Sequence, residues 1–192
     1  MNANVSESAV IRVFDVVFSF IGLIVLSPVL LLVFLIGLAD TGSPLFIQER
    51  IGRAQEPFKL LKFRTMKMDT ASVGTHLADS NAITPFGRFL RKTKLDELPQ
   101  LYNVLIGEMS LVGPRPGLAN QTELTAERLQ RNIFAVRPGI TGFGQLANID
   151  MSTPRKLSRY DQVTIRNLRP RVYIELILAT ALGRGAGDAI RT

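Results

Sequence analysis

Val16–Ala39 reads VVFSFIGLIVLSPVLLLVFLIGLA, and this uncharged stretch decides how the rest of the chain can be arranged. A helix of that length reaches about 36 Å, and about 20 apolar residues suffice to cross the hydrocarbon of a bilayer. The apolar part of a cleaved signal peptide would be shorter, about 7–15 residues. Here the stretch leads directly into a turn at Asp40–Pro44. We therefore predict a membrane element within residues 1–40.

Ser27 and Pro28 lie in the middle of this stretch. A proline inside a helix removes a backbone hydrogen bond and bends the helix, and a serine hydroxyl can bond a carbonyl one turn back. Basic residues flank the stretch on both sides: Arg12 precedes it, and Arg50 and Arg53 follow it. A simple span would have Lys and Arg mainly on one side, so this pattern conflicts with it. We expect a re-entrant helix that breaks at Ser27-Pro28 and returns to the same face. A single span with a tolerated proline is the alternative.

Composition narrows the chemistry of the remaining chain. The 192 residues carry a net charge of +7, with no cysteine and one histidine. The lack of cysteine excludes disulfides, a cysteine-ligated zinc and a thiol nucleophile, and one histidine makes a His-rich metal site impossible. Any reaction must therefore use carboxylates, hydroxyls, Lys and Arg.

Local patterns predict a helix-dominated α+β fold, with a catalytic domain over residues 41–183 and a flexible tail over 184–192. Thr84-Pro85 is a typical helix start, a hydroxyl cap followed by proline in the first turn. Six basic residues are assigned to solvated or lipid-facing surface: Lys92, Arg128, Arg131, Arg155, Lys156 and Arg159. The predicted elements are a strand over 58–66 with Lys62 and Arg64 on one side, a polar segment over 69–81, and helices over 96–105, 123–132, 160–167 and 172–182.

Asp96 and Glu97 are placed by this reading at the start of the helix over 96–105, because Pro99 is tolerated only in a first turn. The positive end of a helix favours carboxylates, and a pair of carboxylates among cations suits Mg²⁺ together with phosphates. A carboxylate can also attack phosphorus and form an acyl phosphate. The plain alternative is that Asp96 caps the helix and Glu97 complements its dipole.

A resemblance to a known family extends over the chain from about Ile11 to Leu182. Its longest block is Thr84–Pro116, TPFGRFLRKTKLDELPQLYNVLIGEMSLVGPRP. This block resembles the bacterial sugar transferase family, the monotopic phosphoglycosyl transferases. Phe58–Met66, Val136–Gly142 with Gln145, and the Ser27-Pro28 break are similar to the same family.

The resemblance implies transfer of a phosphosugar from a UDP-sugar to a polyprenol phosphate such as undecaprenyl phosphate, releasing UMP. Asp96 would form a covalent phosphosugar intermediate, and Glu97 would hold Mg²⁺ and position or deprotonate the second nucleophile. The site would lie at the cytoplasmic face of the bacterial inner membrane, among membrane lipids, in the first membrane step of glycoconjugate synthesis. The further residues implied to bind phosphate or substrate are Arg115, Arg91, Lys62, Arg64, Arg137 and Gln145.

Two other readings stay open at this point. One is a membrane-anchored basic module that binds nucleic acid or anionic lipid, although nucleic-acid-binding signatures are missing from the sequence and we expect no nucleic-acid partner. The other is a transferase in which the lipid phosphate attacks directly and the acidic pair only binds metal. The segment Gly142–Pro154 departs from the family pattern, and we expect it to border the sugar or the nucleotide. The sequence leaves the sugar, the pathway and the oligomeric state open.

Overall fold

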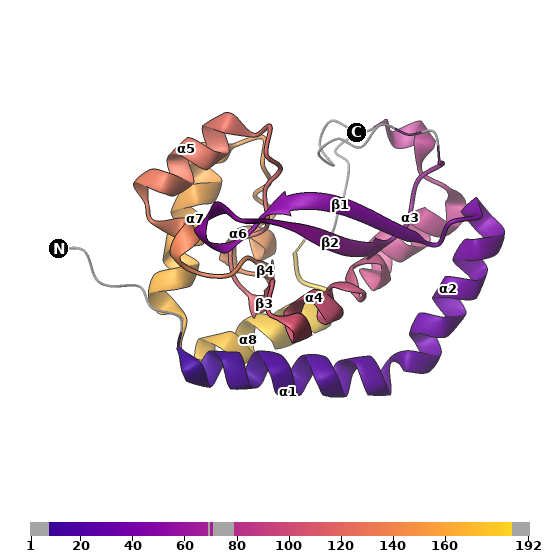
Figure 1. The fold of residues 1–192 in the computed structure, drawn as a ribbon, viewed down its shortest axis with the longest axis horizontal. Coiled ribbons are helices and arrows are strands. Elements are labelled where there is room, and N and C mark those ends of the chain that lie inside the picture. Colours follow the sequence, from indigo (N-terminus) through magenta and orange to yellow (C-terminus); the bar gives the residue numbers. More distant parts are fainter. Residues whose placement is uncertain (1–7, 69, 71–78, 186–192) are drawn as a thin grey trace.

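The computed structural model describes residues 8–68, 70 and 79–185. Helices dominate, and two small sheets complete an α+β fold, as predicted (Figure 1). β1 (Leu45–Ile51) pairs antiparallel with β2 (Pro57–Phe63), and β3 (Ser110–Val112) pairs parallel with β4 (Gly139–Thr141). The helices are α1 (Ala9–Val25), α2 (Ser27–Thr41), α3 (Pro85–Thr93), α4 (Gln100–Ile106), α5 (Thr122–Gln130), α6 (Phe143–Leu146), α7 (Pro154–Asn167) and α8 (Pro170–Ala181), with short 3₁₀ turns η1 (Arg53–Gln55), η3 (Ser80–Ala82), η4 (Leu95–Glu97) and η5 (Ile133–Ala135).

The apolar stretch breaks where the sequence predicted. α1 ends at Val25, α2 begins at Ser27, and the two axes are bent by 62°. Pro28 therefore lies in the first turn of α2, where its missing N–H costs nothing, and the Ser27 hydroxyl donates to Ile24 O at 2.7 Å. Within the described residues no single helix has the length and apolarity to cross a membrane, whereas the bent pair together has both.

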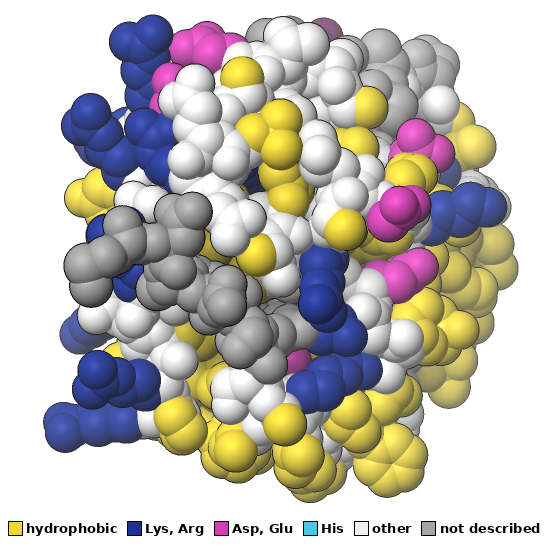
Figure 2. All heavy atoms as spheres, turned by 60° about the vertical axis from the view of Figure 1, so that its left-hand side comes forward, with side chains coloured by type: hydrophobic (Ala, Val, Ile, Leu, Met, Phe, Trp, Pro, Cys, Tyr) yellow, Lys and Arg dark blue, Asp and Glu magenta, His cyan; other side chains and the backbone are white. Residues whose placement is uncertain are grey.

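One side of α1 packs on the protein, and most of the remaining surface of α1 and α2 is apolar and exposed. Ile11, Asp15 and Ser19, spaced four residues apart, are buried against the fold. In α2 only Val33 and Gly37 are buried. Hydrophobic side chains gather along the lower edge of the molecule in Figure 2, the edge along which α1 runs in Figure 1. The exposed apolar side chains of the pair include Val13, Val17, Phe20, Ile21, Ile24, Val25, Leu31, Leu32, Leu35 and Leu38.

Polar contacts fix α1 to the rest of the fold. The buried Asp15 carboxylate accepts hydrogen bonds from Ser110 Oγ (2.9 Å), Leu111 N (2.8 Å) and Tyr173 OH (2.7 Å). Burial and the neighbouring Asp15 raise the pKa of the Tyr173 hydroxyl, which keeps it a donor. Arg12 was interpreted from the sequence as one of the charges that flank the apolar stretch. In the structure it donates to carbonyls at the end of α4. The bent pair is thus attached to β3, α4 and α8.

The C-terminal half differs from the predicted pattern in two places. α7 begins at Pro154, earlier than the helix predicted over 160–167. Arg128 was predicted to be solvated, but it is buried and donates twice to Asp161, so that prediction is wrong. Of the predicted polar segment over 69–81, residues 69 and 71–78 lie outside the described residues, as does 186–192 of the predicted tail.

Candidate active site

The acidic pair lies in a 3₁₀ turn between two helices. α3 starts as predicted, with Thr84 Oγ1 accepting from Gly87 N at 2.9 Å, and it ends at Lys94, whose left-handed backbone (φ 59°) turns the chain. Asp96 and Glu97 follow in η4 and are 2% and 8% exposed. The helix predicted to start at Asp96 starts at Gln100, because Pro99 cannot donate a backbone hydrogen bond and occupies the N-cap. Burial among cations, and not a helix dipole, therefore defines the setting of the pair.

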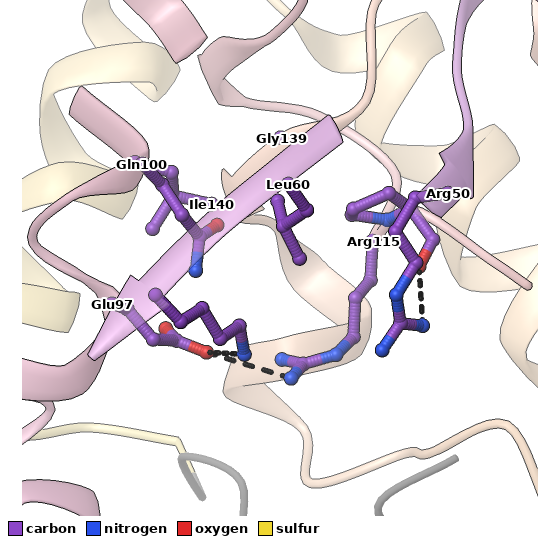
Figure 3. A pocket seen from close by; sticks show the side chains of 9 residues that line it. Arg50, Leu60, Glu97, Gln100, Arg115, Gly139 and Ile140 are labelled. Carbon is purple, nitrogen blue, oxygen red and sulfur yellow. Dashed lines mark hydrogen bonds and ion pairs between the residues drawn. The ribbon is translucent and has the colours of Figure 1, made fainter. Parts of the chain in front are cut away.

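Glu97 joins three segments that are far apart in the sequence. Its Oε1 accepts from Lys62 Nζ at 3.3 Å and lies 3.4 Å from Arg115 Nη2, and all three side chains are mostly buried (Figure 3). Lys62 comes from β2, and Arg115 comes from the loop that follows β3. Two cations on one carboxylate oxygen make a positively charged site around a single acidic group.

A pocket opens on one side of this group, and its empty space, counted together with the open solvent at its entrance, is about 240 Å³. Arg50 of β1 lines it, and its contacts include Nη1 to Pro116 O at 3.2 Å and Nη2 to Gln48 Oε1 at 2.5 Å. Arg50 and Arg115, both labelled in Figure 3, line this pocket. The first pocket is lined by Arg50, Leu60, Lys62, Glu97, Gln100, Arg115, Pro116, Gly139 and Ile140.

A second pocket, with about 250 Å³ of empty space counted in the same way, shares Glu97, Arg115 and Ile140 with the first. Lys94 lines it, and burial lowers the pKa of the Lys94 ammonium; the Glu97 carboxylate opposes this shift and the Arg115 guanidinium adds to it. The second pocket is lined by Lys94, Glu97, Arg115, Ile140, Thr141, Gln145, Leu146, Thr180 and Arg184. The Glu97–Arg115 pair therefore lies between two basic pockets.

The predicted substrate-binding residues divide into two groups. Lys62, Arg115 and Gln145 line the pockets together with Glu97. Among the described residues, the walls of neither pocket include Asp96, Arg64, Arg91 or Arg137.

Hydrogen bonds show where the three other arginines are held. Arg64 Nε donates to Ser43 O at 2.9 Å, because β2 ends at Phe63 and the alternation that paired Arg64 with Lys62 stops there. Arg91 Nε donates to Thr65 Oγ1 at 2.9 Å, and Arg137 Nε donates to Gly107 O at 2.6 Å.

Sequence reasoning missed Arg50, Lys94, Gln100 and Arg184 as pocket residues. Lys94 directly precedes the Leu95-Asp96-Glu97 turn, which is a signal that could have been used. Arg184 was assigned to the tail, yet Lys94 Nζ donates to its carbonyl at 2.6 Å. That contact depends on the approach of α8 to η4, for which the sequence gives no local sign.

The acidic pair fits the ligand requirements of one magnesium ion. Asp96 and Glu97 are adjacent and buried, and among the described residues no group of three or more Asp, Glu, His or Cys side chains could hold a metal. Mg²⁺ is bound in many sites by one or two carboxylates, with water and substrate phosphates completing its shell. A pair of carboxylates beside pockets that suit phosphate meets that requirement.

Fold and site together combine a large exposed apolar hairpin, formed by α1 and α2, with a buried acidic pair whose Glu97 contacts Lys62 and Arg115. The model of the bacterial sugar transferase family matches residues 6–184, and the chain belongs to that family.

The chain is similar to sugar-phosphate transferases and an exopolysaccharide production protein from other bacteria. It is 37% identical over 153 residues to the undecaprenyl-phosphate galactose phosphotransferase of Salmonella typhimurium, covering 71% of this chain. It is 40% identical over 140 residues to the UDP-glucose:undecaprenyl-phosphate glucose-1-phosphate transferase of Escherichia coli, covering 70%. It is 41% identical over 155 residues to the exopolysaccharide production protein PSS of Rhizobium leguminosarum, covering 75%. The aligned part spans 76% of the Rhizobium protein and about a third of the other two, 32% and 30%.

Proposed function

We propose that this protein transfers a sugar phosphate from a UDP-sugar to a polyprenol phosphate such as undecaprenyl phosphate, releasing UMP. The observation that carries the proposal is the Glu97–Arg115 pair between two basic pockets, directly beside the buried Asp96. Two phosphate-bearing substrates need such a concentration of positive charge, because phosphoryl transfer is catalysed mainly by positioning and charge neutralisation. The names of the Salmonella and Escherichia relatives support the acceptor, and the latter also supports the donor.

The reaction proceeds in two balanced displacements at one phosphorus. An Asp96 carboxylate oxygen attacks the sugar-bearing phosphorus, and the bond to the nucleoside phosphate breaks, with its electron pair leaving on UMP. A phosphate oxygen of the polyprenol then attacks the same phosphorus, and the bond to Asp96 breaks, restoring the carboxylate. The products are UMP and a polyprenyl diphosphate sugar.

The other residues hold charge and geometry. Arg115 and Lys62, already placed around Glu97, bind the phosphate oxygens, and Glu97 orients the incoming acceptor phosphate. Mg²⁺ held by Asp96 and Glu97 would neutralise part of the phosphate charge when bound. Because Asp96 is only 2% exposed, donor binding must move side chains around η4 to reach it.

The exposed apolar side chains of α1 and α2 support a site that lies at a membrane surface. The exposed apolar side chains of α1 and α2 would enter the lipid, and the bend at Ser27-Pro28 would return the chain to the face it entered. Residues 1–40 then form a re-entrant anchor, and the catalytic domain over 41–183 lies on the cytoplasmic face of the inner membrane, where the lipid phosphate is presented. This arrangement suits the first membrane step in building a bacterial glycoconjugate.

Trapping the intermediate tests the mechanism. The purified full chain is incubated with Mg²⁺ and a panel of UDP-sugars without lipid acceptor, and intact mass and UMP release are measured. The proposal predicts an added phosphosugar on the protein and about one UMP per chain, both lost in Asp96→Asn. The matched control is Asp79→Asn, which changes an exposed aspartate outside the pockets and should trap the phosphosugar normally.

Direct attack by the lipid phosphate is the second candidate, favoured by the meeting of both pockets at Glu97 and Arg115. It predicts UMP release only when acceptor is present and no adduct. A basic binding module would release no UMP with any donor or acceptor. Each of the three readings therefore gives a different pair of results in the same experiment.

A further inference from the structure

The two pockets differ in chemistry although they share the Glu97–Arg115 pair. The walls of the first pocket add two further cations, Arg50 and Lys62. The walls of the second pocket add Lys94 and Arg184, but also an amide and two hydroxyls, from Gln145, Thr141 and Thr180. A diphosphate suits the first set, whereas a group with both negative charge and hydroxyls suits the second.

Gln145 lines the second pocket, and its side-chain oxygen has no hydrogen-bond partner among the described residues. The side chain is 9% exposed, and its Nε2 donates to Gly113 O at 3.3 Å. That carbonyl can only accept, so the amide is oriented with Nε2 toward it and Oε1 away. Oε1 is buried and unpaired, and buried polar atoms of this kind normally have a partner. The missing partner must be a donor.

The two threonines add a second acceptor. Thr180 Oγ1 donates its single hydrogen to Leu176 O at 2.9 Å. In the 2.6 Å contact between the two hydroxyls, Thr141 must therefore be the donor and Thr180 the acceptor. The lone pairs of Thr141 Oγ1 remain as acceptors. The neutral polar atoms of this pocket thus require donors, and its cations require acceptors.

We propose that the second pocket holds the sugar of the donor, with a sugar hydroxyl donating to Gln145 Oε1 or Thr141 Oγ1, and that these two residues determine which sugar is transferred. The inference rests on the proposed function. The sugar phosphate lies against Arg115 and Lys94 at the junction of the pockets, and the nucleoside phosphate lies against Arg50 and Lys62 in the first pocket. A site built to bond a hydroxyl discriminates strongly against a donor that lacks it or directs it elsewhere.

The test compares Gln145→Met and Thr141→Val with wild type on UDP-glucose, UDP-galactose, their N-acetylamino counterparts and UDP-xylose, which differ at C2, C4 and C6. Both substitutions preserve approximate shape and remove the acceptor. We expect at least one ratio of kcat/KM between donors to change by about tenfold or more, while inhibition by UMP stays unchanged. Thr141→Ser, which keeps the hydroxyl, should restore the wild-type ratios. Arg50→Gln should weaken UMP inhibition and lower turnover of all five donors alike.

Circular dichroism first establishes that each variant folds. If Gln145→Met does not fold, Thr141→Val still tests the proposal. Unchanged donor ratios in the folded variants, with wild type still releasing UMP, would overturn the sugar pocket and leave the proposed function standing. If wild type releases no UMP from any donor, the proposed function fails. Calorimetry then measures the binding of glucose 1-phosphate, galactose 1-phosphate and UMP to wild type and Thr141→Val. The sugar-pocket proposal predicts that Thr141→Val binds the sugar phosphates more weakly and binds UMP as wild type does. Equal weakening for all three ligands, or no weakening, refutes the proposal.

Discussion

Arg128→Met is expected to lower the free energy of unfolding by about 4 kcal/mol at neutral pH, because removing one partner of a buried ion pair typically costs about 3–5 kcal/mol. Arg128 of α5 donates through Nε (2.9 Å) and Nη2 (2.7 Å) to Asp161 Oδ2 of α7, and the two side chains are 3% and 1% exposed. Its guanidinium also lies beside Gly117, at the end of the loop that carries Arg115. The substitution leaves the Asp161 carboxylate buried without its cation.

The loss of unfolding free energy in Arg128→Met depends on pH, because the Asp161 carboxyl can take up a proton. Burial raises the pKa of this carboxyl above its ordinary 3.8, against the opposing effect of Arg128. In Arg128→Met the pKa of Asp161 rises further, because the opposing effect of the arginine is gone. The buried Asp161 of the folded variant therefore keeps a proton, whereas the same carboxyl in the unfolded chain releases it. Keeping that proton costs about 1.36 kcal/mol per pH unit above 3.8, or ~4.4 kcal/mol at pH 7 and ~1.6 kcal/mol at pH 5. The stability of the variant therefore falls as pH rises from about 4 to 7. In wild type Arg128 opposes the rise in the pKa of Asp161, so stability falls less with pH than in the variant and the deficit grows with pH.

Urea unfolding of the detergent-purified protein, followed by far-UV circular dichroism at pH 5, 6 and 7, measures this difference. Arg171→Met is the matched control, because the Arg171–Glu175 pair has side chains 89% and 57% exposed and should change stability by less than about 0.5 kcal/mol. Adding Asp161→Leu to Arg128→Met should recover most of the loss, since an apolar pair needs no counter-ion. A deficit that is the same at all three pH values would refute the reasoning.

Three further substitutions test other parts of the structure. Gly87→Ala would place a methyl group 2.0 Å from a backbone oxygen of the segment after β2, and should cost about 3 kcal/mol in urea unfolding, since backbone must move. Tyr173→Phe removes a donor from the buried Asp15 carboxylate and should cost about 2 kcal/mol by the same measurement, whereas an unchanged midpoint would argue against the contact. Because the chain has no cysteine, Ser8→Cys and Ser152→Cys provide single labelling sites in membrane vesicles. The re-entrant proposal predicts that an impermeant maleimide labels both from the same side, and labelling from opposite sides would indicate a span.

Features that depend on neighbouring residues were predictable from the sequence. The break at Ser27-Pro28 and the Thr84 cap each follow from one residue and its nearest turn, so the structure confirms them within a residue. The apolar exposure of the hairpin follows from an uninterrupted run of hydrophobic side chains that a domain of this size leaves uncovered. The resemblance pointed to Lys62, Glu97 and Arg115, which the fold brings into contact.

Tertiary structure decided which charges meet. Arg128 carries a charge of the kind that is usually solvated, and only the approach of α7 gives it Asp161 as a partner 33 positions later in the chain. Lys94 and Arg184 form one pocket wall because α8 ends beside η4. Propensities and caps act over a few residues and can be read locally, whereas the partner of a charged side chain depends on long-range packing that a single sequence does not specify.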